Sequence, residues 1–355
     1  MNAVRDLAIE EIAKTWSLSA FGDSELSPCE NGFDWLPGSH TVHVRIFDDE
    51  RKSESPLPGR FRITIFTDFL RSVPVLSDKF THLVGASSKF LSSGYSFVYP
   101  PFDVWKEYFN GQPAEMQLFS SAYVDQAIAG WLPSFLAQMA IMQPINAEIR
   151  STTAFEMFGG GVPAFAGGSK KASISEILNL GETVFVPEGK KENKWSGSDE
   201  FEQFAEKHAK NDFCFGLGDK EGMTLETPFG ADSAIIRFQT DQQHPQLGNG
   251  LLITTQIRSS QRFEDVCVEA ASLNYFESRF WTDFPQLGCW HPQEASENVA
   301  NWAHTCFIPN ALFRSGLVAN FAFWAMARVQ WVRHTRFPQL KDQTMAEILE
   351  SRFRH

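Results

Sequence analysis

Apolar and polar residues alternate in two pairs of segments, one pair in each half of the chain. Val42, Val44 and Ile46 share one side of a predicted strand, and the same alternation recurs in the next strand, over 61–67. The segments IIRFQTDQ (235–242) and LLITTQI (251–257) show a similar pattern in the second half. The pattern predicts one sheet in each half.

These segments belong to a longer internal repeat. Arg45 aligns with Arg237, and the pairs that follow in the next strand keep nearly the same offset of about 190 residues. Gly32 aligns with Gly222 upstream, and the apolar segment from Asp125 matches the one that begins at Arg314. A series of matches in one order indicates a duplicated module.

Helical spacing of apolar residues predicts three helices in each half. They span 4–16, 76–91 and 125–142 in the first half, and 200–210, 264–280 and 314–331 in the second. Three strands separate the first two helices and two strands precede the last. The fold class predicted is α+β: two tandem α-β-β-β-α-β-β-α modules with antiparallel sheets.

The segment MFGGGVPAFAGGSKKAS (157–173) separates the two modules. It lacks the order of Gly, Lys and hydroxyl residues that a phosphate-binding loop needs, and it contains no G-x-G-x-x-G. We therefore interpret it as a flexible connection. The predicted organisation is a first module over 1–155, a Gly/Ser/Lys-rich linker over 156–198, a second module over 199–337 and a helical tail over 338–355.

The last helix of each module is apolar all round, so it needs a covering surface on every side. One side can pack on the sheet of its own module. The matching helix of the other module is the simplest cover for the opposite side. We therefore predict that the two final helices pack back to back and that the modules form an intramolecular pseudo-dimer, which can exist as a monomer in solution.

Composition narrows the class of partner. The chain has 33 Phe but 5 Tyr, which suits dry cores and buried interfaces, and its net charge of −12 disfavours nucleic acid. Its two most apolar segments contain charged and amide residues and do not predict membrane spans. Five cysteines without a C-x-x-C pair predict reduced thiols and a cytoplasmic location.

One set of residues has the chemistry of a zinc site. The segments CWH (289–291) and HTC (304–306) place two thiols and two imidazoles on neighbouring predicted strands. If His291 lies opposite His304, then Cys289 lies opposite Cys306 and all four side chains share one sheet face. The alternative is a half-buried strand pair with inert thiols. No catalytic, cofactor-binding or metal-binding residue is assigned, because no nucleophile elbow or other diagnostic motif accompanies these residues.

The order of elements in each half resembles that of the class I type III secretion chaperones and of the YbjN-type sensory-transduction regulators. The resemblance covers about 1–150 and 199–337 and carries no site residue with it. It implies a homodimer-like fold that holds extended peptide segments of partner proteins. The chain departs from this pattern in its long linker, its extra C-terminal helix and its Phe- and Trp-rich second half.

The function expected from the sequence is therefore non-enzymatic binding of a protein or peptide, in a chaperone-like or regulatory role, without a cofactor, nucleic acid or membrane as partner. The first alternative is a metal-dependent protein or enzyme with zinc at Cys289, His291, His304 and Cys306. A second alternative is a structural subunit or an antitoxin-like immunity partner.

Overall fold

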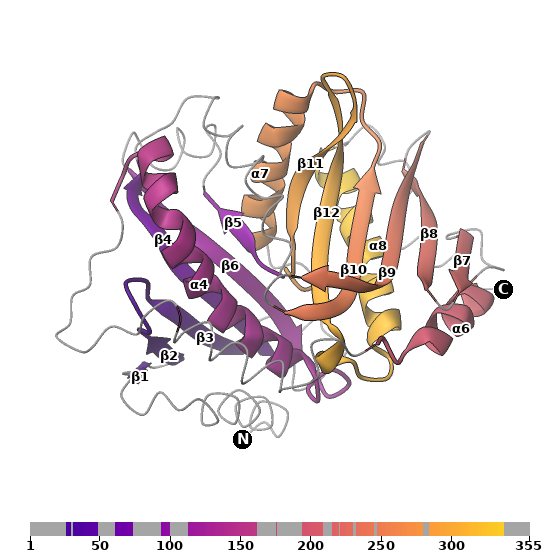
Figure 1. Ribbon diagram of the computed structural model, residues 1–355, viewed down its shortest axis with the longest axis horizontal. Coiled ribbons are helices and arrows are strands. Elements are labelled where there is room, and N and C mark those ends of the chain that lie inside the picture. The colour runs from indigo at the N-terminus through magenta and orange to yellow at the C-terminus, as the bar shows by residue number, and fades with distance from the viewer. Residues whose placement is uncertain are drawn as a thin grey trace.

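The computed structural model describes two antiparallel sheets with helices packed on them (Figure 1). The described residues are 26–29, 31–48, 61–73, 94–99, 113–161, 175, 194–208, 215–219, 221–229, 232–244, 247–279 and 284–336. The predicted helices 4–16 and 76–91, the strand-like segment 182–189 and the tail 338–355 lie outside these ranges.

Sheet 1 belongs to the first module and has six strands in the order β1-β2-β3-β4-β6-β5. Helix α4 (Leu132–Phe158) covers one of its faces. The strands are β1 (Leu26–Cys29), β2 (Gly32–Trp35), β3 (Val42–Asp48), β4 (Phe61–Val73), β5 (Ser96–Val98) and β6 (Ala114–Val124).

Sheet 2 belongs to the second module and has the order β11-β12-β10-β9-β8-β7. Its strands are β7 (Phe215–Asp219), β8 (Gly222–Phe229), β9 (Asp232–His244), β10 (Gly248–Ile257), β11 (Cys289–Ser296) and β12 (Val299–Pro309). Helices α6 (Ser198–His208), α7 (Phe263–Arg279) and α8 (Leu317–Arg336) accompany it, and a short 3₁₀ helix, η1 (Asn310–Leu312), follows β12.

The two sheets have the same topology, which confirms the α+β class and the tandem arrangement. Strand by strand, β1 to β6 correspond to β7 to β12 in both chain order and spatial order. The register agrees as well, because Arg45 lies opposite Thr64 in sheet 1 and Arg237 lies opposite Thr254 in sheet 2. The aligned arginines of the sequence repeat therefore occupy equivalent positions.

Each module has one strand more than the sequence predicted before its middle helix. The additional strand comes from a tight hairpin, in which Cys29 pairs with Gly32 and Asp219 pairs with Gly222. A Cβ atom at Gly32 would lie 2.0 Å from the carbonyl oxygen of Val44, and one at Gly222 would make an equally close contact in its own sheet. Each glycine begins the second strand of its hairpin, so two short strands are present where the sequence pattern predicts one.

The glycines at the end of α4 both stop the helix and attach the chain that follows it. Gly159 and Gly160 have φ values of 71° and 85°, which a glycine adopts without strain. Gly161 then exchanges two backbone hydrogen bonds of 2.8 Å with Arg71 at the end of β4. The module boundaries at 155 and 199 remain sequence-based predictions, while α4 itself continues to Phe158 and α6 begins at Ser198.

The final helices of the two modules touch near their first turns. Trp131, the N-cap of α4, lies 5.7 Å from Phe321 and 5.9 Å from Trp324 of α8, measured between ring centroids. Farther along, the two helices follow separate sheets (Figure 1). The predicted contact is therefore present at one end of each helix, and it is not a seam along their whole length.

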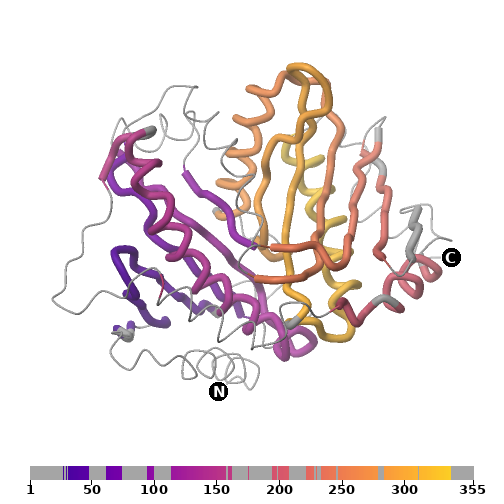
Figure 2. The backbone as a smooth tube through the Cα atoms, viewed as in Figure 1, coloured from indigo at the N-terminus to yellow at the C-terminus, as the bar shows by residue number. Residues whose placement is uncertain are grey.

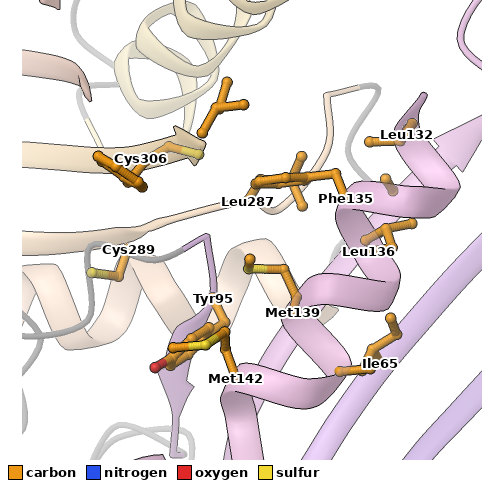
Figure 3. Packing of buried hydrophobic residues seen from close by; sticks show 14 of the residues in the cluster. Ile65, Tyr95, Leu132, Phe135, Leu136, Met139, Met142, Leu287, Cys289 and Cys306 are labelled. Atoms are coloured by element: carbon orange, nitrogen blue, oxygen red, sulfur yellow. The ribbon is translucent and has the colours of Figure 1, made fainter. Parts of the chain in front are cut away.

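Much of the contact between the modules comes from α7 and from the segment 284–288. Helix α7 packs against β5 and β6 of sheet 1, as the backbone trace shows (Figure 2). Gln286 exchanges two backbone hydrogen bonds, of 3.1 and 2.6 Å, with Ser121 of β6, and its side chain donates to Ser96. Leu287 lies beside Phe135 of α4 (Figure 3). One continuous apolar core therefore includes residues from both modules.

Within the described residues, no helix has the length and apolar character that crossing a membrane requires.

Candidate functional site

The predicted zinc quartet is divided between the two faces of sheet 2. Strands β11 and β12 form the predicted hairpin, but Cys289 lies opposite Thr305 and Trp290 lies opposite His304. His304 and Cys306 therefore share a face with Trp290, while Cys289 and His291 lie on the other face. The predicted register is wrong by one residue, and the four side chains do not converge on one point.

A β-bulge explains the shift in register. At the hairpin end Ser296 pairs with Val299, which is the register that the sequence argument assumed. The register changes between Glu294 and Ser296, because one additional residue, Ala295, is inserted there. Across the described part of the chain, no group of three or more His, Cys, Asp or Glu side chains is arranged to hold a metal ion.

The two histidines of this hairpin have structural surroundings. His291 Nε2 lies 2.8 Å from the hydroxyl of Thr305, and its Nδ1 lies 3.0 Å from the carbonyl oxygen of Pro292. His304 is fully buried, edge-on to Trp290 at 5.3 Å, and burial holds its pKa well below the usual range. A neutral, enclosed imidazole of this kind fits a packing role.

The buried cysteines are held as neutral thiols. Burial raises the pKa of Cys267 and that of Cys306 to about 12, and it raises the pKa of Cys289 further. A thiol nucleophile needs the opposite shift, toward a thiolate at neutral pH. These three cysteines are therefore not suited to nucleophilic catalysis.

We expect alkylation to separate the exposed cysteine from the buried ones. Near pH 8, a thiol with a pKa of about 12 is ionised in only about one molecule in ten thousand. Iodoacetamide should therefore modify Cys29, which is exposed, in the native protein and should reach Cys267, Cys289 and Cys306 only after denaturation. Peptide mass spectrometry measures each site, and native modification of Cys289 as fast as that of Cys29 would contradict the assignment.

A buried ion pair near this hairpin ties together the helices of the second module. The guanidinium of Arg328 on α8 donates from Nε to both carboxylate oxygens of Glu277 on α7, at 3.1 and 3.3 Å. The indole of Trp290 donates to the same carboxylate at 2.6 Å, and Arg328 also donates to the carbonyl oxygen of Pro285. Burial raises the pKa of Glu277, while Arg328 and Trp290 act in the opposite direction. The network joins elements of the core and is closed to solvent.

A second charged group lies on the face of sheet 1 that α4 does not cover. We call it the open face because, among the described residues, His43, Arg45 and Phe66 on it are partly exposed. His43 of β3 lies between two carboxylates, with Nδ1 2.8 Å from Asp34 of β2 and Nε2 3.5 Å from Asp68 of β4. Arg45 lies 2.6 Å from the carboxylate of Asp34, and Arg71 donates to that of Asp68 at 3.1 Å. We refer to these five side chains as the ionic cluster.

The ionic cluster forms because neighbouring strands bring alternate residues to one face. Asp34 lies opposite His43, and His43 lies opposite Phe66 in the next strand. The imidazole of His43 stacks on the ring of Phe66 at 4.6 Å, and the guanidinium of Arg45 lies 6.0 Å from the same ring. The cluster is therefore fixed by strand pairing and by one aromatic ring.

The carboxylates determine the charge of His43. Burial alone would lower the pKa of His43, but hydrogen bonds from its ring to Asp68 and Asp34, together with their charges, outweigh burial and raise it. Burial would raise the pKa values of Asp34 and Asp68, and their contacts with His43 and with the neighbouring arginines lower them. The site therefore favours an imidazolium ion between two carboxylates.

This arrangement suits binding better than catalysis. Both ring nitrogens of His43 face carboxylates, so neither presents a lone pair that a general base would need. His43 and Arg45 lie over Phe66, and the two carboxylates and Arg71 complete a group of three cationic and two anionic side chains. Such a surface offers charged groups to a polar or charged segment laid across it.

The same face is already an interface farther along the sheet. Tyr275 and Phe276 of α7 pack against Val98, Phe119 and Phe66 of sheet 1. The second module thus covers the β5 and β6 side of the open face, and the ionic cluster borders this contact.

The second module lacks the ionic cluster. Given that Arg45 and Thr64 correspond to Arg237 and Thr254, His43 corresponds to Ile235 and Phe66 to Gln256. Arg237 donates to the amide oxygen of Gln256 at 2.9 Å, in place of a carboxylate. Because both modules form the same sheet, the fold itself does not require the cluster.

The fold and the cluster define a class of protein, a tandem pair of six-stranded α+β modules with a charged cluster on one sheet. Comparisons of the chain with protein-family models, with curated proteins and with solved structures find no match. The functional argument therefore depends on the chemistry of the site.

Proposed function

We propose that the protein is a non-enzymatic, chaperone-like or regulatory protein that binds an extended segment of a protein partner on the open face of sheet 1. The resemblance of the predicted element order to that of the type III secretion chaperones and YbjN-type regulators supports this proposal, and the structure adds one strand per module to that order. We also propose a cytoplasmic location, since the described cysteines are free thiols.

The observation that carries the proposal is the presence of the ionic cluster in only one of two equivalent sheets. A buried or half-buried charge is costly unless it is paired, so a fold that forms without such charges gains little by adding them. The second module forms the same six-stranded sheet with Ile235 at the position of His43. Recognition of a partner gives the cluster a role that folding alone does not.

Strand addition within the molecule supports an extended segment as the ligand. Gln286 adds to the edge of β6 beside Ser121, and Gly161 adds to the end of β4 beside Arg71, each through a pair of backbone hydrogen bonds. Backbone pairing at a sheet edge is a common way for one chain to bind an extended segment of another. Sheet 1 accepts such segments at two places in its own chain.

Selection from a random peptide library displayed on phage tests the proposal. We expect wild-type protein to enrich peptides that bind Arg45→Gln about tenfold more weakly, a loss of about 1.4 kcal/mol. The matched control is Arg237→Gln, at the equivalent position of sheet 2, which should bind the same peptides as wild type does.

Two results would contradict the proposal. One is the absence of any enriched peptide, and the other is equal binding by Arg45→Gln and Arg237→Gln. Because Arg45 also donates to the carbonyl oxygen of Phe33, circular dichroism must show that the variant is folded. Arg71→Ala, whose side chain is 47% exposed, serves as a second variant with less effect on folding.

A further inference from the structure

We infer that His43 is a proton-dependent latch that holds the β1–β2 hairpin (26–35) on the rest of sheet 1 and thereby regulates the binding face. The part of this inference that concerns binding rests on the proposed function. The latch itself is a property of the free protein and has its own test.

The geometry of the imidazole carries the inference. His43 lies on β3, and its two ring nitrogens face Asp34 on β2 and Asp68 on β4, at 2.8 and 3.5 Å. A doubly protonated ring donates to both carboxylates, whereas a neutral ring has one N–H and must turn a lone pair toward the other carboxylate. Loss of one proton therefore breaks the link from β2 across β3 to β4.

The other groups around His43 do not replace this link. On β3 itself, Arg45 contacts Asp34 and its Nη2 lies 3.3 Å from His43 Nδ1, while on β4 Arg71 contacts Asp68. The group contributed by β6 is the neutral amide of Gln117, which donates to Asp68 at 3.3 Å. Each carboxylate thus keeps a partner after His43 loses its proton, and Arg45 still joins Asp34 of β2 to β3. What is lost is the bridge that His43 makes between Asp34 of β2 and Asp68 of β4.

The hairpin that the latch holds lies at the edge of the sheet, where opening needs the fewest broken contacts. Strand β2 pairs with β3 through four residue pairs, from Gly32–Arg45 to Trp35–Val42. Because the pKa of His43 is raised, its stabilising contribution is complete below the usual pKa of histidine. It is lost as the pH rises through the raised value, so alkaline conditions should loosen the hairpin, while Arg45 keeps Asp34 next to β3.

The second module supplies an internal control. Its β7–β8 hairpin (215–229) has the same place in sheet 2, and the residue equivalent to His43 is Ile235, which does not titrate. Opening of this hairpin should therefore not depend on the protonation of His43. Dividing the amide protection factors of the first hairpin by those of the second cancels changes that affect the whole molecule.

Amide hydrogen exchange measured by mass spectrometry between about pH 6 and pH 9 tests the latch. Protection factors, corrected for the intrinsic pH dependence of exchange, are compared for 26–35 and 215–229. In wild type we expect the ratio of the first to the second to fall about tenfold as the pH rises, the effect of losing one charged hydrogen bond. In His43→Gln, the ratio should not vary with pH.

A constant ratio in wild type would overturn the latch, as would an equal fall in His43→Gln. If that variant does not fold, Asp34→Asn replaces it, since removal of one carboxylate should also reduce the pH dependence. Peptides selected near pH 6.5 are then titrated over the same range. If peptides bind but the protection ratio does not change with pH, the latch is refuted and the proposed function is not. If the ratio changes with pH but no peptide binds, the proposed function is refuted and the latch is not.

Discussion

Arg328→Met is expected to lower the free energy of unfolding by roughly 3–5 kcal/mol, because it leaves the carboxylate of Glu277 buried without its cation. The side chains of Arg328 and Glu277 are 5% and 2% exposed, so water cannot replace the lost partner. The variant also loses the hydrogen bond from Arg328 to the carbonyl oxygen of Pro285, next to the residue that bridges to sheet 1. Urea denaturation followed by circular dichroism measures the change.

Two further variants show whether burial is the cause. Arg262→Met removes an exposed arginine–carboxylate pair, in which Arg262 donates from Nε and Nη2 to Asp265, and should leave the midpoint of unfolding nearly unchanged. The double variant Glu277→Met/Arg328→Met should be more stable than Arg328→Met alone, because it leaves no unpaired charge. A wild-type midpoint for Arg328→Met would contradict the interpretation.

Phe135→Ala is expected to destabilise the protein by roughly 3–5 kcal/mol and to affect both modules at once. Phe135 of α4 is fully buried, packs edge-on against Phe321 of α8 at 6.4 Å and lies beside Leu287 (Figure 3). Its removal leaves a cavity where the two modules meet. Circular dichroism and tryptophan fluorescence should report a single unfolding transition that shifts as a whole.

The matched control is Phe155→Ala, on the same helix but 43% exposed, for which we expect a change of less than about 0.5 kcal/mol. Two separate transitions, of which Phe135→Ala shifted only one, would show that the modules unfold independently. The pseudo-dimer would then be two linked domains instead of one cooperative unit.

The duplicated fold was predictable because its signal is local and occurs twice. Alternation in β3 and β4 returns in β9 and β10, and the predicted strands that hold CWH and HTC are β11 and β12. The register of β11 on β12 was not predictable in the same way, because one inserted residue, Ala295, reverses which side chains share a face. No local pattern marks that bulge, and the alternative of a zinc site depended on the register that the bulge changes.

The ionic cluster was not found from the sequence, although part of its signal was present. His43 and Arg45 alternate with Val42, Val44 and Ile46, so the sequence places them on the polar side of the predicted strand. Asp34 and Asp68 join them only through the pairing of three strands, and Asp68 lies far along the chain from Asp34. Strand order and register had to be known before these residues could be grouped.

The bridge from Gln286 to the first sheet has a consequence during synthesis. Gln286 lies 190 residues after Ser96, the serine of β5 whose hydroxyl accepts from its side chain. At roughly 5–20 residues per second, the ribosome needs about 10–40 s to make that stretch of chain. Throughout that interval, β6 of the nascent first half lacks the backbone partner that Gln286 later provides, and the apolar surface that α7 later covers is exposed. The growing polypeptide is therefore most prone to mispairing and aggregation just before its second half emerges.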